Sequence, residues 1–389
     1  MGRRRALDGL RGVAVSTVVA SHTLVSAGGG FLGVDVFFVL SGYLITSLMI
    51  KEWDRAGGID LVAFYRRRAV RLAPAYLFML ALAVPMMAGP LRAQTGWPWP
   101  LAVGATLIYA GNWAAVINTE ALGPIGHTWS LAIEEQFYLI WPAVFIVLSR
   151  RRRALLPWLI GGIAAIVAIR LVGWYATHTS WGYFATVTHG DGLLIGCLVA
   201  VLLAGTGRRA TARLDTPVLA WASVAGLGGL MLFARIDDGS TYTGVLTLCV
   251  LLTALIVRHL EGGGAQGRMA ALLSTGPLVA VGRVSYGLYL YHFPVFHLVG
   301  SMGLGYLRTI VVEYAASIAL TVFSWYVIER PSQRWAARRW PRTEPAALGT
   351  PATSGTPARA TPGTPAGARG PAVLQQSRIE PVSVDPVRA

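Results

Sequence analysis

The sequence alternates between apolar blocks of roughly 20 residues, the length that crosses a bilayer as a helix, and short clusters of arginine. The apolar blocks lie near residues 10–28, 31–50, 70–89, 130–148, 154–173, 191–205, 217–234, 242–257, 277–299 and 309–328. Backbone polar groups must be satisfied internally in a ~30 Å hydrocarbon core, which favours helices. The pattern therefore predicts an all-α, polytopic transmembrane helix bundle with about ten spans.

The overall charge is consistent with a membrane protein and argues against a nucleic-acid partner. Only 13% of the 389 residues are charged, against about 25% in soluble domains. The net charge of +15 is spread over arginine clusters between the apolar blocks, at 3–5, 66–71, 150–153, 208–213 and 330–339. Cytoplasmic loops carry such clusters. We expect a multi-pass protein of the cell membrane, surrounded by lipids, with both termini in the cytoplasm.

One apolar stretch, residues 101–117, conflicts with this topology. If it crossed the bilayer, the arginines at 150–153 would lie outside, against the positive-inside rule. We therefore expect a re-entrant or interfacial segment there.

The composition changes near residue 340. Residues 1–340 carry all the apolar blocks, whereas 341–389 are rich in Pro, Ala and Gly and too poor in large apolar side chains to fold. We expect one membrane domain followed by a disordered cytoplasmic tail. Cys197 and Cys249 have no partner at metal-site spacing, so no metal site is expected.

Ionisable groups inside spans are costly and are usually functional. Arg11 and His22 are eleven residues apart, which places them on one helical face, ~16 Å apart along the axis. Arg11 would lie near the cytoplasmic surface and His22 near the middle of the membrane. A neutral imidazole there suits general-base catalysis; the alternative is a histidine hydrogen-bonded between helices.

Four arginines lie at the entrance to the third span, and Arg68 and Arg71 share a helical face. Guanidinium groups bind phosphates bidentately, so this pair is a candidate phosphate site. The alternative is a topology signal that contacts lipid headgroups.

The segment 127–138 is the most polar of the apolar regions. His127, Ser130, Glu134 and Glu135 open the next span, and in the expected topology they face outward. Helix capping explains one of the two glutamates but not the whole set. Further candidates for a substrate pocket are Asp35, Tyr43, Asp191 and His292. The alternative role is capping or bracing of helix ends for Asp35, capping for Asp191 and a structural role for His292.

Several short motifs in this order resemble the acyltransferase 3 family of integral membrane O-acyltransferases, across roughly residues 5–340. The matching stretches are 7–12, the Arg-x10-His spacing that ends at His22, 33–42, 128–131 with 134–138, 285–289 with His292, and 329–331.

The resemblance implies transfer of an acyl group, commonly acetyl from acetyl-CoA, to a hydroxyl of a carbohydrate or similar acceptor. It implies essential roles for Arg11 and His22 and a role for Arg68 and Arg71, here in binding the phosphates of acyl-CoA, with no permanently bound cofactor. Glu134, with His127 and Ser130, would orient the acceptor. Because 1–389 contain no added esterase-like domain of the kind some members carry, the membrane domain either completes the transfer or passes the acyl group to a partner.

Other functions remain open at this point. The acceptor is either a cell-envelope glycan or lipid-linked sugar, or a small metabolite such as a macrolide. A transporter or flippase also places charges inside the membrane, but no inverted repeat or pair of broken helices supports one. The sequence does not specify the oligomeric state.

Overall fold

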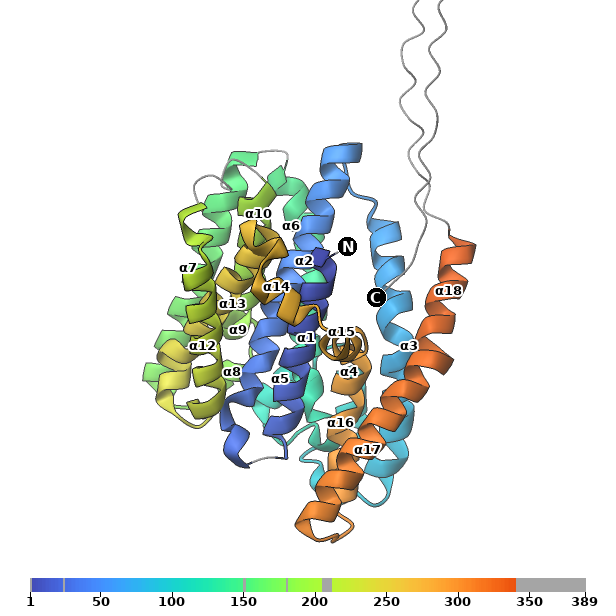
Figure 1. Ribbon diagram of the computed structural model, residues 1–389. Helices are drawn as coiled ribbons and strands as arrows, with labels where there is room; N and C mark the ends of the chain where they lie inside the picture. The colour runs from blue at the N-terminus through green and yellow to red at the C-terminus, as the bar shows by residue number, and fades with distance from the viewer. Residues whose placement is uncertain (1, 24, 150–151, 180, 205–211, 341–389) are drawn as a thin grey trace, which may run out of the picture. The chain divides into compact units, whose positions relative to one another are not determined.

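A computed structural model describes residues 2–23, 25–149, 152–179, 181–204 and 212–340, and these residues contain helices and no strand (Figure 1). The tail predicted at 341–389 and part of the arginine clusters at 150–153 and 208–213 lie outside the described residues. The prediction of an all-α fold is confirmed.

The helices follow one another along the chain in three stretches. The first half contains α1 Gly2–Ser21, η1 Val25–Leu32, α2 Gly33–Ala56, α3 Leu61–Ala88, η2 Arg92–Gln94, α4 Trp99–Leu107, α5 Gly111–Ile117, η3 Gly123–Thr128, α6 Trp129–Ser149 and α7 Arg152–Thr177. The middle contains α8 Trp181–Phe184, α9 Thr186–His189, α10 Asp191–Ala204, η4 Ala212–Leu214, α12 Pro217–Phe233, the π-helical turn η5 Thr241–Val245 and α13 Leu246–Glu261. The last part contains η6 Gly263–Gln266, α14 Arg268–Leu273, α15 Gly276–Arg283, α16 Ser285–Gly300, α17 Tyr306–Ser324, the π-helical turn η7 Trp325–Glu329 and α18 Arg330–Arg339.

Six helical segments are long and apolar enough to cross a bilayer, which identifies a membrane protein. They are Gly28–Ala56, Leu61–Ala88, Gly123–Ser149, Leu155–Thr177, Thr241–Glu261 and Tyr306–Arg339. Four further predicted spans differ from this type. Two of them form the shorter apolar helices α10 and α12, residues 277–299 are divided between α15 and α16, and α1 carries several arginines. Length and composition thus account for six of the predicted spans.

The segment 101–117 forms two short helices, α4 and α5, in place of one long helix. They are separated at Tyr109, whose φ of 55° lies in the left-handed region. Helices of nine and seven residues are too short to cross a ~30 Å core.

Close contact between α2 and α10 organises the centre of the bundle. In Figure 1, α1 and α2 lie between a group formed by α7, α10, α12 and α13 and a second group formed by α3, α16, α17 and α18. A Cβ atom on Gly42 of α2 would overlap the carbonyl oxygen of Leu193, and one on Gly196 of α10 would overlap that of Val39. The two backbones can approach this closely only because both positions are glycine, as at other small-residue helix contacts in membranes.

We expect Gly42→Ala to lower the thermal unfolding midpoint of the purified protein. The added methyl group forces the two helix backbones apart, at a cost of about 1–3 kcal/mol. Gly228→Ala on α12 is the matched control, because a Cβ atom there meets nothing within 4 Å. The control keeps or slightly raises the midpoint. Equal midpoints for the two variants would show that the α2–α10 contact does not depend on glycine.

Candidate functional site

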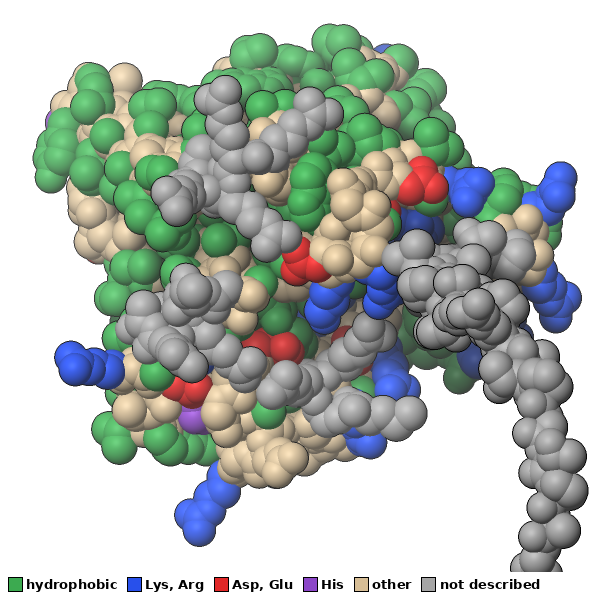
Figure 2. Space-filling view, turned by 90° about the horizontal axis from the view of Figure 1, so that it is seen from above, with side chains coloured by type: hydrophobic (Ala, Val, Ile, Leu, Met, Phe, Trp, Pro, Cys, Tyr) green, Lys and Arg blue, Asp and Glu red, His purple; other side chains and the backbone are tan. Residues whose placement is uncertain are grey.

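One pocket formed by the described residues, which we call the arginine pocket, has a volume of about 150 Å³ and lies among α1, α2, α3, α6 and α16. Its charged lining residues are Arg11, Arg68, Arg71, Glu134 and Glu135. Figure 2 views the molecule from above and shows basic side chains on this face, with acidic ones between them. Residues 11, 68 and 71 come from helices far apart in the sequence, so only the tertiary fold brings them together.

The polar groups of the arginine pocket are only partly paired. An Nη of Arg68 donates to Glu135 Oε1 at 2.8 Å, and its guanidinium lies over the Tyr138 ring. Ser41 Oγ donates to Glu134 Oε1 at 2.9 Å, and Arg11 Nη2 donates to Ser285 Oγ at 3.2 Å.

The Nε atoms of Arg11 and Arg68 are buried and have no hydrogen-bond partner among the described residues. Buried donors without an acceptor are costly. Three guanidinium groups also face only two carboxylates in this pocket. The pocket is therefore suited to an anionic ligand.

The second pocket, which we call the histidine pocket, has a volume of about 350 Å³. It is lined by His22, Gln94, Phe293, Phe296, His297, Gly300, Ser301 and Glu313. His22 directly follows Ser21, the last residue of α1, and is an exposed residue that lines this pocket.

The tautomer of the neutral His22 ring follows from its contact with the backbone. His22 Nδ1 lies 2.8 Å from the carbonyl oxygen of Val18, which can only accept. Nδ1 therefore carries the proton, and Nε2 has a free lone pair. The ring can act as a base or a nucleophile through Nε2.

A line of rings lies between the two pockets. The ring centroids of His22 and His292 are 5.2 Å apart, those of His292 and His127 are 5.5 Å apart, and those of His127 and Tyr289 are 5.4 Å apart. Tyr289 lines the arginine pocket, and its hydroxyl lies 2.6 Å from Ser130 Oγ. His127 and His292 were predicted as pocket residues, but they line neither pocket and instead separate the two.

The predicted position of the 127–138 segment is wrong. It was expected to face outward, opposite the arginines, yet Ser130, Glu134 and Glu135 line the arginine pocket itself. Ser130 and Glu134 are one turn apart on α6 and face the interior of the bundle. The cations of α1 and α3 there offset the desolvation of the carboxylates, which lipid does not.

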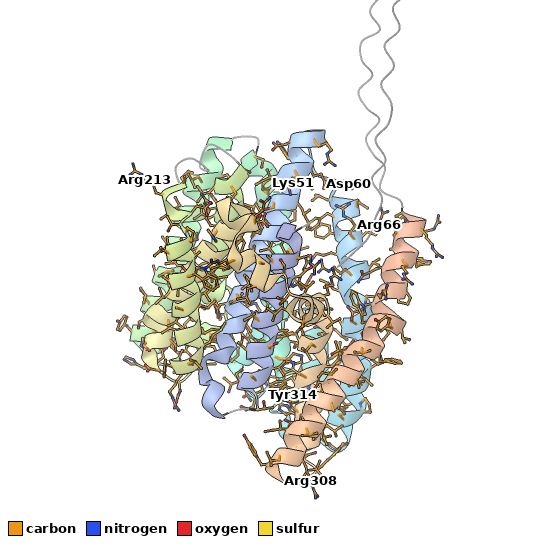
Figure 3. All side chains as sticks on the ribbon, viewed as in Figure 1. Lys51, Asp60, Arg66, Arg213, Arg308 and Tyr314 are labelled. Carbon is orange, nitrogen blue, oxygen red and sulfur yellow. The ribbon has the colours of Figure 1, made fainter. Side chains whose placement is uncertain are left out.

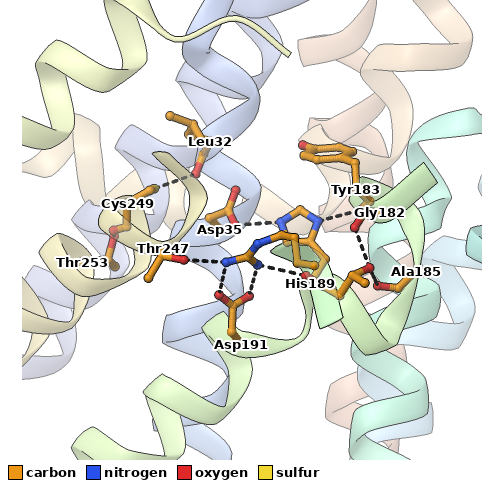
Figure 4. A network of polar contacts seen from close by, with 12 residues as sticks. Leu32, Asp35, Gly182, Tyr183, Ala185, His189, Asp191, Thr247, Cys249 and Thr253 are labelled. Carbon is orange, nitrogen blue, oxygen red and sulfur yellow. Dashed lines mark hydrogen bonds and ion pairs between the residues drawn. The ribbon is translucent and has the colours of Figure 1, made fainter. Parts of the chain in front are cut away.

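Asp35 and Asp191 are also not pocket residues in the structure. Asp35 Oδ1 accepts a hydrogen bond from His189 Nε2 at 2.8 Å, and Asp191 pairs with Arg170 through two bonds of 3.0 and 2.9 Å (Figure 4). These four side chains are buried and join α2, α7, α9 and α10. Tyr43 is likewise buried and lines neither pocket.

Sequence reasoning missed Arg170, His297 and Glu313. Each is an ionisable residue inside a helix that is otherwise largely apolar, and that position is the signal that identifies such residues. The described residues contain no group of three or more His, Cys, Asp or Glu side chains placed to hold a metal ion.

The Arg170–Asp191 pair leads to a stability prediction. We expect Asp191→Leu to destabilise the protein by about 3 kcal/mol, because it leaves a buried guanidinium without its counter-charge. Adding Arg170→Met removes that charge and should restore much of the lost free energy of unfolding, which is measured for both variants in the same detergent. A double variant no more stable than Asp191→Leu would contradict this explanation.

Comparisons with known proteins identify the family of the chain. A family model described as an acyltransferase domain matches residues 4–330. O-acetyltransferase OatA of Staphylococcus aureus (strain NCTC 8325 / PS 47) is 31% identical over 350 residues, which cover 84% of this chain and 57% of the relative. Peptidoglycan O-acetyltransferase OatA of Listeria monocytogenes serovar 1/2a is 31% identical over 357 residues, which cover 85% and 56%.

No solved structure matches the chain. The chain spans somewhat more than half the length of these curated relatives. The match to the family model extends from the start of α1 to the first residue of α18 and includes both pockets. The chain belongs to the acyltransferase 3 family.

Proposed function

We propose that the protein is a membrane O-acyltransferase that moves an acyl group, most simply acetyl, from acyl-CoA to a hydroxyl of a carbohydrate acceptor. The observation that carries the proposal is the position of Arg11 and His22. Arg11 lines a pocket suited to anions, and His22 lines a separate pocket with a free imidazole nitrogen. A donor and an acceptor could thus reach α1 at two different points.

The arginine pocket is the proposed donor site. Arg68 and Arg71 would bind phosphates of acyl-CoA, since guanidinium groups form bidentate hydrogen bonds with phosphate. The unpartnered Nε atoms of Arg11 and Arg68 would be available to the same ligand. Glu134, held by Ser41, would position Arg11 and the acyl end of the donor.

The reaction requires a proton to leave the acceptor. His22 Nε2 would take the proton of the acceptor hydroxyl while its oxygen attacks the thioester carbonyl; the C–S bond then breaks and the CoA thiolate takes up a proton. In the alternative route, Nε2 first takes the acyl group from CoA and then passes it to the hydroxyl. Both routes require the acyl group to pass His127, His292 and Tyr289, which separate the pockets.

The relatives support a glycan as the acceptor. The Listeria relative is named a peptidoglycan O-acetyltransferase, and the Staphylococcus relative is named an O-acetyltransferase. We therefore propose a cell-envelope glycan as acceptor and acetyl as the transferred group.

His22→Ala should reduce acetyl transfer by about 100-fold or more, because it removes the proposed base or acyl carrier. Transfer is measured with purified protein, acetyl-CoA and glycan. If His22 is the base, slow CoA release without acceptor persists in the variant; if it is the carrier, that release is lost too. His178→Asn is the control, since His178 is exposed, lines neither pocket and has a φ of 50°, which Asn tolerates. Transfer by His22→Ala at the wild-type rate would exclude His22 from the chemistry.

We further propose ten spans with both termini in the cytoplasm of the cell. Lys51, Arg66 and Arg213 lie toward one end of the bundle, whereas Tyr314 and the isolated Arg308 lie toward the other (Figure 3). Clustering of basic residues at one end supports that end as the cytoplasmic one. The arginine pocket would then open toward the cytoplasm, where acyl-CoA is made.

A reporter enzyme inserted after Arg153 tests this topology. We expect the reporter to lie in the cytoplasm. The number of crossings before Arg153 is even only if residues 101–117 do not cross the bilayer. An insertion after Gly303, in the turn before α17, is the opposite control and should report from outside. An external signal after Arg153 would contradict the ten-span topology.

A further inference from the structure

The histidine pocket is lined by a largely buried glutamate that has no partner among the described residues. Glu313 lies on α17 with a side chain that is 6% exposed, and it forms no hydrogen bond or ion pair with any described residue. Burial of an ionisable group without a partner in a membrane helix is costly and usually marks function. The groups around Glu313 indicate what it binds.

The other polar groups of the pocket are mainly acceptors. His297 Nδ1 donates to the carbonyl oxygen of Phe293 at 3.0 Å, so in the neutral ring Nε2 is an acceptor. Ser301 already donates its hydroxyl proton to Leu298, and His22 Nε2 is likewise an acceptor. Apart from the amide of Gln94, the lining therefore lacks strong donors. It is complementary to a ligand that donates several hydrogen bonds.

The charge of the pocket restricts this ligand further. Of the described residues that line it, none is lysine or arginine, and Glu313 is the one carboxylate. An anionic group next to Glu313 would be repelled without compensation. The groups His22, His297 and Glu313 are also not placed to hold a metal ion together.

The remaining walls are aromatic. Phe293 contacts the His22 ring edge-on at 5.0 Å between centroids and the His297 ring at 4.5 Å, and Phe296 lines the pocket beside it. Such a combination of apolar ring surface with a few polar groups is typical of small-ligand sites. The apolar C–H face of a sugar ring can lie on these phenyl rings while its hydroxyls reach the acceptors.

From these contacts we infer that Glu313 and His297 form the acceptor site, and that this site binds an uncharged, hydroxyl-bearing sugar next to His22. The inference rests on the proposed function, to which it adds the acceptor-binding residues and the charge preference. Glu313 accepts hydrogen bonds from sugar hydroxyls, His297 accepts a further one, and neither residue exchanges a proton or the acyl group.

The test compares Glu313→Gln with Glu120→Gln in protein held in lipid nanodiscs. Glu120 is an exposed glutamate that does not line the pocket but interacts electrostatically with His297, so its variant controls for the loss of a negative charge near the same pocket. The probes are chitotetraose, an uncharged N-acetylglucosamine tetramer, and a tetramer of galacturonic acid. Equilibrium binding is measured without acetyl-CoA; acetyl transfer and CoA release are measured with it.

We expect the wild-type protein and Glu120→Gln to bind and acetylate chitotetraose in preference to the anionic tetramer. Glu313→Gln should raise Kd and KM for chitotetraose about 10- to 100-fold, the effect of losing hydrogen bonds to a charged acceptor. The kcat at saturating acceptor and CoA release without acceptor should stay unchanged. His297→Gln should raise KM less, because it removes one neutral acceptor.

Unchanged chitotetraose binding by Glu313→Gln would overturn the inference, as would wild-type protein that binds neither probe or prefers the anionic one. If Glu313→Gln lost CoA release without acceptor to the same extent as it lost chitotetraose binding, Glu313 would act in the donor step or in folding, and the inference would be wrong. Chitotetraose binding that depends on Glu313, with no CoA release by wild-type protein, would instead reject the proposed function and keep the sugar site.

Discussion

A polar group in the membrane interior must find its partner within the protein, and this requirement shapes the bundle. Asp35 bonds to His189, and Arg170 forms two hydrogen bonds with Asp191, so four helical segments are joined by groups that lipid cannot solvate. Glycines at residues 42 and 196 also allow a close contact between α2 and α10, the helix that begins at Asp191. The buried network is therefore a support for α2, which also carries Ser41 of the arginine pocket.

Some polar groups of the described residues remain without a partner, and among them are groups that line the two pockets. In the arginine pocket, donors on Arg11 and Arg68 have no acceptor among the described residues; in the histidine pocket, the Glu313 carboxylate has no donor among them. The unpaired groups have opposite character, so the two pockets favour ligands of different chemistry. An anionic acyl donor and an uncharged, hydroxyl-bearing acceptor fit this difference. Helix α1 contributes Arg11 to the arginine pocket, and His22, the residue that follows α1, lies in the proposed acceptor pocket.

Much of the proposed site was predictable from the sequence because ionisable residues in apolar helices are rare. Arg11, His22 and Glu134 were singled out in this way, Arg68 and Arg71 as a guanidinium pair, and all five line one of the pockets. The same reasoning failed for Asp35 and Asp191, since a charge that forms a buried ion pair and a charge that faces a ligand look alike in a sequence. Arg170, His297 and Glu313 carried the same signal and were missed because no motif drew attention to them.

The sequence by itself determined that the chain is helical, that it belongs in a membrane and which residue types are costly there. These properties follow from composition and periodicity, which act locally along each helix. Only the tertiary structure decided which polar groups pair and which stay free. That outcome depends on which helix faces meet. Glu134 therefore lines the same pocket as Arg11, Arg68 and Arg71, although the sequence predicted that it faces outward. For the same reason, His22 and Glu313 line one pocket although they are far apart in the sequence. The residues that follow them, Thr23 and Tyr314, are joined by a hydrogen bond across a sequence separation of 291.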